Sequence, residues 1–235
     1  NNSKYIHQLQ TVLNSTTKWA ANWGFRISTD KTVAMLFSPR KKSKQVYPRL
    51  YLQGQLIKFV AHTTFLGMKL DERLTWTIHI QDLTRRCQAD LNTLNHIRGN
   101  NWGADQTTLL QLYRSLIRAK LDYACQIYDS ASPYQLDKLD SIQYKALKMC
   151  TGVLPTTSLD ELQVLAGELP LHLRRQEQIL RYGIRTSAHY HTHPVENAIE
   201  KANNTNLTIP TNRLSAVNKI IILQRELQIE SIQAE

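Results

Sequence analysis

The fold depends on one short stretch, residues 63–76, which reads Thr63-Thr64-Phe65-Leu66-Gly67-Met68-Lys69-Leu70-Asp71-Glu72-Arg73-Leu74-Thr75-Trp76. Before it, β-branched and aromatic residues alternate as they do in strands. After it, apolar residues recur at steps of three and four as they do in amphipathic helices. Gly67 permits a sharp bend, and we expect Phe65 and Leu66 to anchor that bend in a core. The stretch therefore predicts a hinge between a small sheet and a helical arm.

The part before this stretch predicts one helix followed by short strands. Helical spacing over residues 5–19 indicates an amphipathic helix that ends at Gly24. Residues 31–37 have the composition of a buried strand. Residues 50–57 predict a hairpin, because Gly54 supplies the positive φ that a tight turn requires.

The part after it predicts a series of helices. Apolar stripes cover residues 80–97, 109–117, 136–149, 162–165 and 173–184. Ser132-Pro133 and Pro170 mark helix starts, and Gly152 and Gly167 mark helix ends. From Ser187 the chain is rich in Asn, Thr and His, which indicates a poorly ordered tail with one further helix at 216–229.

Composition narrows the class of protein. The 235 residues carry a formal net charge of +10 with an isoelectric point near 9.6, which favours polyanionic partners, meaning nucleic acid or an anionic membrane surface. Three well-separated cysteines, Cys87, Cys125 and Cys150, are typical of reduced core residues. The sequence has neither an apolar run long enough for a membrane span nor a signal peptide, so we expect an intracellular protein of cytoplasm and nucleus.

Cations recur on the predicted helices, and they are the strongest signal for a partner. One basic cluster, Arg40 to Lys44, lies in a loop. Any single cation is more often part of a solvated helix face, but the repeated bias indicates phosphate contacts. The candidate nucleic-acid-binding residues are Arg85, Arg86, Arg114, Arg118, Lys145, Lys148, Arg174 and Arg175.

Catalytic and metal-binding patterns are weak. Two-metal phosphoryl transfer requires closely spaced carboxylates, and the sequence contains no Asp-Asp pair. Asp71-Glu72 lies in a polar turn, where acidic residues more often face water. His189, His191 and His193 could converge on zinc from an extended segment, although a His-rich linker is the commoner explanation.

Several ordered motifs resemble the reverse transcriptases of non-LTR retrotransposons of the insect jockey-like type, over about residues 5–186. In chain order they are Trp19-x3-Trp23-Gly24-Phe25-Arg26-Ile27 with Lys31-Thr32, Phe65-Leu66-Gly67, Leu74-Thr75-Trp76-x2-His79-Ile80, Trp102-Gly103-Ala104-Asp105, Leu112-Tyr113-x3-Ile117-Arg118-x2-Leu121-Asp122-Tyr123, Leu139-Asp140-x-Ile142-Gln143 and Ala166-Gly167-Glu168-x-Pro170-Leu171-x-Leu173-Arg174-Arg175. Each motif alone is weak, but their order is specific.

The resemblance implies an α+β fold: a small antiparallel β palm remnant with one helix (1–75), a mainly α-helical thumb (76–186) and a linker-like tail (187–235). Lys31 matches a lysine proposed to assist pyrophosphate departure. Phe65, Leu66 and Gly67 match the hairpin that holds the primer 3′ end. The implied partners are an RNA template, an RNA–DNA or DNA primer duplex, and the upstream palm and fingers of the same polyprotein, with no membrane.

The motif that holds Mg²⁺ in this family, a Tyr/Phe-x-Asp-Asp strand, would lie upstream of residue 1. We therefore expect no cofactor in this chain, Mg²⁺ in the complete parent enzyme, and no polymerase activity from the chain alone. The alternative is a non-catalytic, basic helical nucleic-acid-binding module, either domesticated or degenerate.

Overall fold

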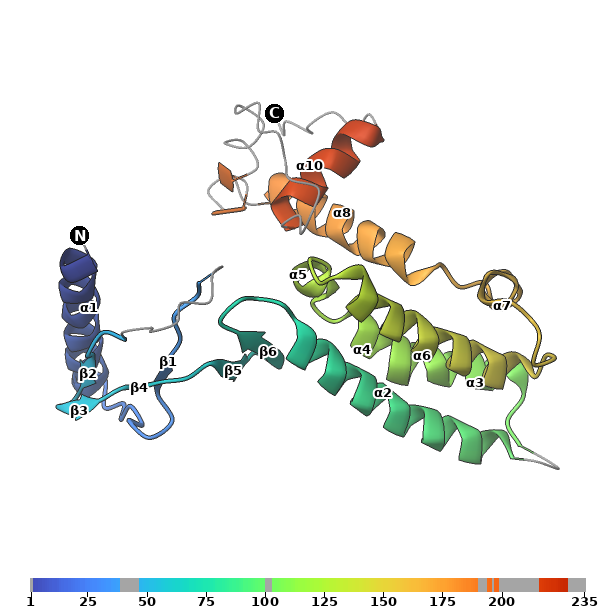
Figure 1. The fold of residues 1–235 in the computed structure, drawn as a ribbon, viewed down its shortest axis with the longest axis horizontal. Coiled ribbons are helices and arrows are strands. Elements are labelled where there is room, and N and C mark those ends of the chain that lie inside the picture. Colours follow the sequence, from blue (N-terminus) through green and yellow to red (C-terminus); the bar gives the residue numbers. More distant parts are fainter. Residues whose placement is uncertain are drawn as a thin grey trace. The chain divides into compact units, whose positions relative to one another are not determined.

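The computed structural model describes residues 2–38, 47–99, 103–189, 194–195, 197–198 and 216–227. The chain divides into two compact units, residues 1–74 and 75–235, called here the first and second unit. The described helices lie mostly in the second unit and all the described strands lie in the first (Figure 1). The prediction of an α+β fold with a helical C-terminal region is confirmed.

Helix α1 (Asn2–Asn22) packs against a hairpin of strands β2 (Tyr51–Leu52) and β3 (Gln55–Leu56). The predicted turn is present, with φ of 52° at Gln53 and 80° at Gly54. Leu50, Leu52 and Ile57 are buried beneath the helix, where Ile6 and Leu13 pack against them. The hairpin predicted at 50–57 is therefore confirmed, and it forms the small core of the first unit.

Strand β1 (Val33–Ala34) corrects two predictions. It is only two residues long, and Val33 and Phe37 are 40% and 50% exposed, so the segment 31–37 is not a buried strand. It also pairs in parallel with β4 (Lys58–Phe59), whereas we expected an antiparallel sheet. The described strands form separate two-stranded pairs rather than one sheet. A strand in so small a pair has no second sheet neighbour and little to cover its faces, which explains the exposure.

Strands β5 (His62–Phe65) and β6 (Met68–Asp71) form an antiparallel hairpin that includes most of the stretch 63–76. Its turn is Leu66-Gly67, with φ of 46° and 77°, which matches the type I′ geometry of two-residue hairpins. Phe65 and Leu66 are 63% and 73% exposed. The prediction that they anchor the bend in a core is wrong, because residues at a hairpin tip extend beyond the strands that could cover them.

The chain passes between the units at residues 74 and 75. Leu74 and Trp76 both adopt positive φ, 49° and 62°. Gly67 therefore serves the hairpin turn, and the predicted hinge lies several residues later.

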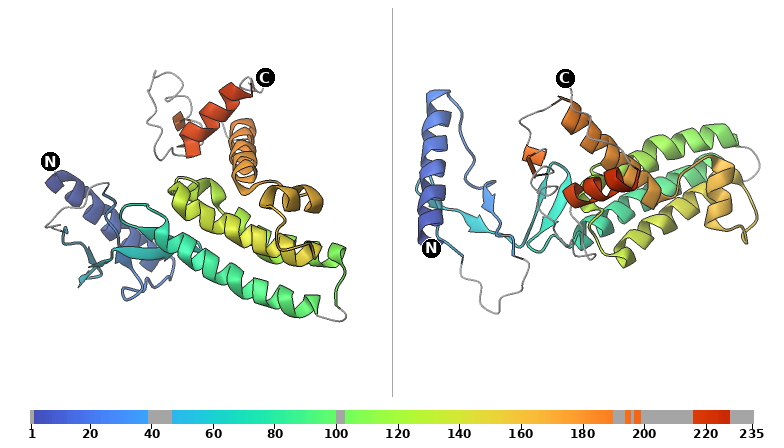
Figure 2. Two further views of the ribbon diagram at one scale, coloured as in Figure 1. Left: turned by 45° about the vertical axis from the view of Figure 1, so that its right-hand side comes forward. Right: turned by 90° about the horizontal axis from the view of Figure 1, so that it is seen from above.

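Three helical segments form the core bundle of the second unit. They are α2 (Thr77–Arg98), α6 (Pro133–Thr151) and a continuous run of α3 (Gln106–Leu112), the π-helix η1 (Tyr113–Arg118) and α4 (Ala119–Asp122). Figures 1 and 2 show α2 and α6 side by side, with the α3–α4 run against both. Their facing stripes bury the side chains of Ile80, Leu83, Leu91, Leu94, Tyr113, Ile117, Leu139, Ile142 and Leu147.

Helix ends follow the sequence signals. Ser132 precedes Pro133 at the first position of α6, and Gly152 ends it in the left-handed region. Ser158 and Glu161 form a capping box at the start of α7 (Leu159–Ala166). The boundaries predicted at Ser132-Pro133, Gly152 and Gly167 are confirmed.

Helix α8 (Leu171–His189) contacts α6 and the short α5 (Cys125–Tyr128), and α10 (Ala216–Glu226) packs on α8. Ile179, Ile220, Ile221 and Leu223 are buried at the α8–α10 contact. The helix predicted within 216–229 is thus confirmed, while most of the predicted tail lies outside the described residues. Cys87, Cys125 and Cys150 are buried free thiols, as expected.

Candidate nucleic-acid interface

The β5–β6 hairpin presents two apolar side chains to solvent. Phe65 and Leu66 are mostly exposed at its tip, whereas Met68, across the turn, is 4% exposed. The turn is held by Gly67, where a positive φ carries no steric penalty. The predicted primer-binding residues therefore lie together at the turn of one hairpin of the first unit.

Lys31 lies in the turn that precedes β1, and its side chain is exposed. The turn is fixed by Thr32, whose hydroxyl donates to the carbonyl of Ser28 at 2.7 Å. Since β1 pairs with β4, which leads into β5, the turn that contains Lys31 precedes a strand next to the one that leads into the hairpin.

Two of the predicted cations on α2 share one carboxylate. Arg85 and Arg86 each approach Asp82 to 3.0 Å, and their side chains are 74% and 39% exposed. Exposed pairs of this kind are weak, so both guanidiniums can also reach a phosphate.

Arg114 and Arg118, unlike Arg85 and Arg86, form ion pairs with a buried carboxylate. Both project from η1 onto Glu168, at 2.7 and 2.9 Å, and the Glu168 side chain is 1% exposed. Arg114 also donates to the carbonyl of Ala166. One buried carboxylate thus fastens the α7–α8 connection to the π-helix.

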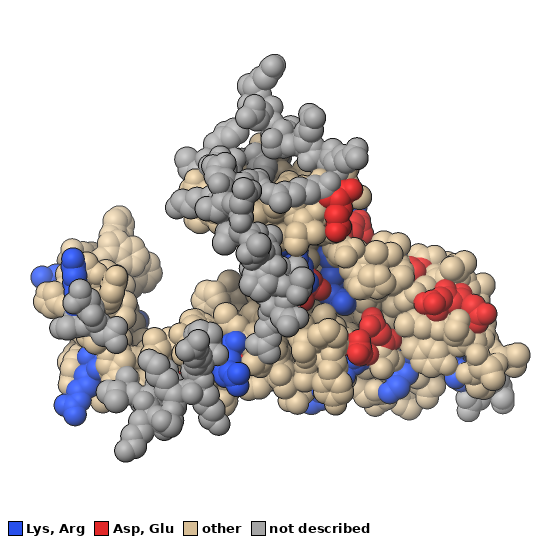
Figure 3. Space-filling model, turned by 45° about the horizontal axis from the view of Figure 1, so that its top comes forward, with Lys and Arg blue, Asp and Glu red and all other residues tan. Residues whose placement is uncertain are grey.

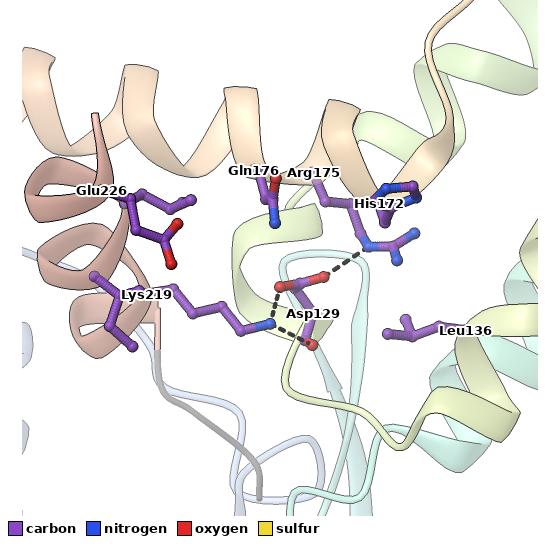
Figure 4. A pocket seen from close by; sticks show the side chains of 9 residues that line it. Asp129, Leu136, His172, Arg175, Gln176, Lys219 and Glu226 are labelled. Carbon is purple, nitrogen blue, oxygen red and sulfur yellow. Dashed lines mark hydrogen bonds and ion pairs between the residues drawn. The ribbon is translucent and has the colours of Figure 1, made fainter. Parts of the chain in front are cut away.

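Arg174 and Arg175 at the start of α8 are also paired inside the second unit. Arg174 donates two hydrogen bonds to Asp122, at 2.7 and 2.5 Å, and this hydrogen bonding raises the pKa of Arg174. Arg175 is 7% exposed and donates to Asp129 at 2.6 Å. Figure 4 shows Asp129 between Arg175 and Lys219, both of which bind its carboxylate.

These contacts give four of the eight candidate cations a structural role; that they also touch nucleic acid stays a prediction. Sequence reasoning missed their acidic partners, Glu168, Asp122 and Asp129. The sequence did hint at these ion pairs. Glu168 lies in the same motif as Arg174 and Arg175, and Asp122 lies in the same motif as Arg118. Spacing alone does not show which acid meets which base.

Several known proteins are similar to this chain in sequence. The chain is 27% identical over 144 residues to the RNA-directed DNA polymerase from mobile element jockey of Drosophila melanogaster, covering 61% of this chain and 15% of that protein. It is 27% identical over 180 residues to the putative 115 kDa protein in type-1 retrotransposable element R1DM of the same species, covering 76% of this chain and 17% of that protein. Its homologues are RNA-directed DNA polymerases of non-LTR retrotransposons. The resemblance to jockey-like reverse transcriptases is confirmed.

The chain spans only part of these relatives. A further one, the retrovirus-related Pol polyprotein from type-1 retrotransposable element R1 of Nasonia vitripennis, is 25% identical over 161 residues, which cover 66% of this chain and 48% of that protein. This partial coverage fits the interpretation of the chain as a segment of a longer polymerase. No family model and no solved structure matches it.

The net charge of the chain is unevenly divided. Residues 1–74 contain 12 Lys and Arg against 3 Asp and Glu, whereas residues 75–235 contain 17 against 16. On the face drawn in Figure 3, the cations of the helical unit alternate with acidic groups. The excess of +10 therefore belongs almost entirely to the first unit, while the helices carry balanced charge.

Two of the candidate cations are accessible on α6. Lys145 is exposed, and the Lys148 ammonium lies 5.5 Å from the ring of Tyr144 and 3.4 Å from the carbonyl oxygen of Pro155. The basic cluster at residues 40–44 lies outside the described residues.

Among the described residues, no three His, Cys, Asp or Glu side chains come together as metal ligands would. Glu72 of the Asp71-Glu72 pair accepts a 2.8 Å hydrogen bond from the Tyr47 hydroxyl, which raises the pKa of Tyr47. The proposed zinc cluster cannot be placed, since His191 and His193 lie outside the described residues, as does the side chain of His189. No helix in the described part is both long and apolar enough to cross a bilayer.

Proposed function

We propose that this chain holds the template–primer duplex within an RNA-directed DNA polymerase of a non-LTR retrotransposon, the first unit forming the end of the palm and the second the thumb. The observation that carries this proposal is the match to polymerases of these elements over 58–79% of the chain. The excess of positive charge supports it, because neutralising phosphates supplies sequence-independent affinity for nucleic acid.

In this proposal, the hairpin tip and the cations bind different parts of the template–primer duplex. The exposed Phe65 and Leu66 form an apolar tip that can rest against the terminal base or sugar of a primer, while Gly67 keeps the tip in place. The cations of the first unit, together with Arg85, Arg86, Lys145 and Lys148 on helix faces, contact the duplex backbone and so position it without reading its sequence.

A salt titration tests the thumb contacts. The double variant Lys145→Gln with Lys148→Gln should weaken binding to an RNA–DNA hybrid and lower the slope of log affinity against log salt by roughly two. The control with the same change in net charge is Gln106→Glu with Gln111→Glu on exposed positions of α3, where the slope should change much less. Equal effects in the two variants would show that only overall charge matters and would remove α6 from the interface.

A substitution at the hairpin tip tests whether the tip contacts the primer end. Leu66→Asn keeps a residue that tolerates positive φ but removes the apolar side chain. In the complete polymerase we expect it to raise the KM for primer–template and to leave thermal stability unchanged. A variant with unaltered primer binding would contradict the assignment of the tip to the primer end.

We propose that the carboxylates that hold the catalytic Mg²⁺ ions belong to another part of the complete polymerase. We propose that Lys31 acts on phosphate oxygens in the complete enzyme, where an ammonium group stabilises developing negative charge. Lys31→Ala should then lower kcat more than it raises KM. The chain alone should not extend a primer with Mg²⁺ and nucleotides. Primer extension by the chain alone would contradict the proposal that the catalytic carboxylates lie elsewhere in the polymerase.

A further inference from the structure

A pocket of about 310 Å³ opens in the second unit between α2 and the run from η1 to α4. His79 and Arg86 of α2 line one side. Ser115 and Leu116 of η1, with Ala119, Lys120 and Tyr123, line the other. None of the interface residues discussed above except Arg86 belongs to it.

The backbone around this pocket is irregular on one side. Ser115 and Leu116 lie in the π-helical turn, a wider helix form that is rare and often found at functional sites. Tyr123 ends α4, and the next residue, Ala124, adopts the left-handed region with φ of 52°. Such strain in a residue other than glycine persists where the surrounding structure imposes it. The result is a helix end that leaves the Tyr123 side chain 55% exposed at the pocket.

The charges of the lining are of one sign. Arg86 and Lys120 carry positive charge at the rim, and their carboxylate partners, Asp82 and Asp90, are not lining residues. The side chains of Arg86 and Lys120 keep 39% and 35% of their surface exposed, and each is also paired with a carboxylate. The pocket of Figure 4 differs, because Asp129 and Glu226 line it and Asp129 already binds both Arg175 and Lys219.

A tyrosine ring, two apolar side chains and two cations match the groups of one nucleotide. The base can stack on Tyr123 over Leu116 and Ala119, while its phosphate lies at Arg86 and Lys120. Ser115 donates its hydroxyl hydrogen to the carbonyl of Leu112 at 3.1 Å, which leaves its oxygen able to accept a hydrogen bond from the base. A base inside a duplex is covered on both faces by its neighbours, so only an unpaired nucleotide can enter.

We propose that this pocket binds one unpaired nucleotide next to the duplex, such as the first base of a single-stranded extension. The proposal rests on the nucleic-acid binding proposed above and adds a preference for single-stranded over blunt ends.

The experiment compares two probes with the 235-residue chain: a blunt RNA–DNA hybrid and the same hybrid with a short single-stranded extension. Fluorescence anisotropy should show tighter binding to the extended hybrid. Tyr123→Ala should remove this advantage, lowering affinity for the extended hybrid roughly five- to tenfold while affinity for the blunt hybrid stays unchanged. Tyr123→Phe should retain the advantage, because stacking needs the ring and not the hydroxyl.

Two further variants sharpen the test. Tyr134→Ala is the matched control, because Tyr134 is 70% exposed on α6 and does not line the pocket; it should behave as the unmodified chain. Ala119→Leu fills the pocket without removing any contact group and should abolish the advantage as Tyr123→Ala does. A fluorescent adenine analogue in the extension should be quenched on binding, and Tyr123→Ala should remove the quenching.

The outcomes separate this inference from the proposed function. Equal affinity of the unmodified chain for both probes would contradict the proposal that the pocket binds an unpaired nucleotide, and so would an equal loss of affinity for both probes in Tyr123→Ala. Neither result would contradict the proposed binding of the duplex. Binding of neither probe would overturn both proposals.

Discussion

At the scale of single residues, Glu168 has the largest structural consequence. Its carboxylate is buried, yet it accepts hydrogen bonds from two arginines, which together satisfy a charge that burial would otherwise penalise. Gln143 and Gln163 form a second buried polar contact nearby, at 2.7 Å, and Gln143 also donates to the carbonyl of Leu169. The segment 163–169 is therefore held by polar contacts of fixed geometry rather than by apolar packing alone.

Replacing Glu168 should lower the free energy of unfolding more than replacing an acidic residue of an exposed ion pair. Glu168→Gln leaves Arg114 and Arg118 without their counter-charge, and we expect a loss of about 2–3 kcal/mol. This lies below the 3–5 kcal/mol of fully buried pairs because both arginines are partly exposed. Urea denaturation measures it. Glu177→Gln breaks an exposed pair with Arg181 and should cost well under about 1 kcal/mol. Equal losses would mean that the buried position of Glu168 is unimportant.

The three cysteines should be inert in the folded chain. Burial raises the pKa of Cys87 and Cys150 to about 11 and that of Cys125 to about 12. Because the thiolate is the reactive form and appears only as pH rises toward these values, reaction with a thiol reagent at pH 8 should be slow. Addition of urea should make all three react rapidly. Fast reaction of any cysteine before unfolding would show that its site opens locally.

At the scale of elements, helices were predicted better than strands, and the reasons are local. The ends of α6 and α7 depend on Ser132-Pro133, Ser158 and Gly167, whose capping preferences act within a few residues. The extent of β1 depends instead on what covers it, which a single run such as 31–37 does not encode. The candidate cations show the same limit: exposed Lys145 and buried Arg175 have similar helical surroundings in sequence, and only the fold brings Asp129 to Arg175.

The contact between α8 and α10 depends on a glycine. A Cβ added at Gly183 would lie 2.8 Å from the Ile220 Cγ2, which is closer than packed carbon atoms approach. Alanine normally stabilises a helix relative to glycine, but here we expect Gly183→Ala to destabilise the α8–α10 pair by about 1–3 kcal/mol through overpacking. The loss caused by Gly183→Ala should be smaller in an Ile220→Ala background than in the unmodified chain, since the clashing methyl group is absent there. Thermal denaturation of the single and double variants measures both effects. A stabilised single variant would show that α10 is not packed on Gly183.

At the scale of the whole molecule, stability and charge reside in different units. The second unit contains most of the buried side chains, including the stripes of α2 and α6, and its Lys and Arg nearly balance its Asp and Glu. The first unit has a small core of Leu50, Leu52 and Ile57 but carries nearly all the excess cations. The long-range attraction of this chain for phosphate thus originates in its less extensively packed part.

This division predicts how a truncated chain behaves. Residues 75–235 alone should retain the helical circular dichroism and the main thermal transition of the full chain, because the helical core lies within them. Their affinity for an RNA–DNA hybrid should nevertheless fall sharply, and the salt slope should decrease, because about nine positive charges are removed in net. The full chain carrying Lys58→Gln and Arg73→Gln should show a smaller decrease in slope with no change in the helical transition. A truncated chain that keeps the full slope would place the phosphate contacts on the helices and would assign the charge of the first unit to another partner.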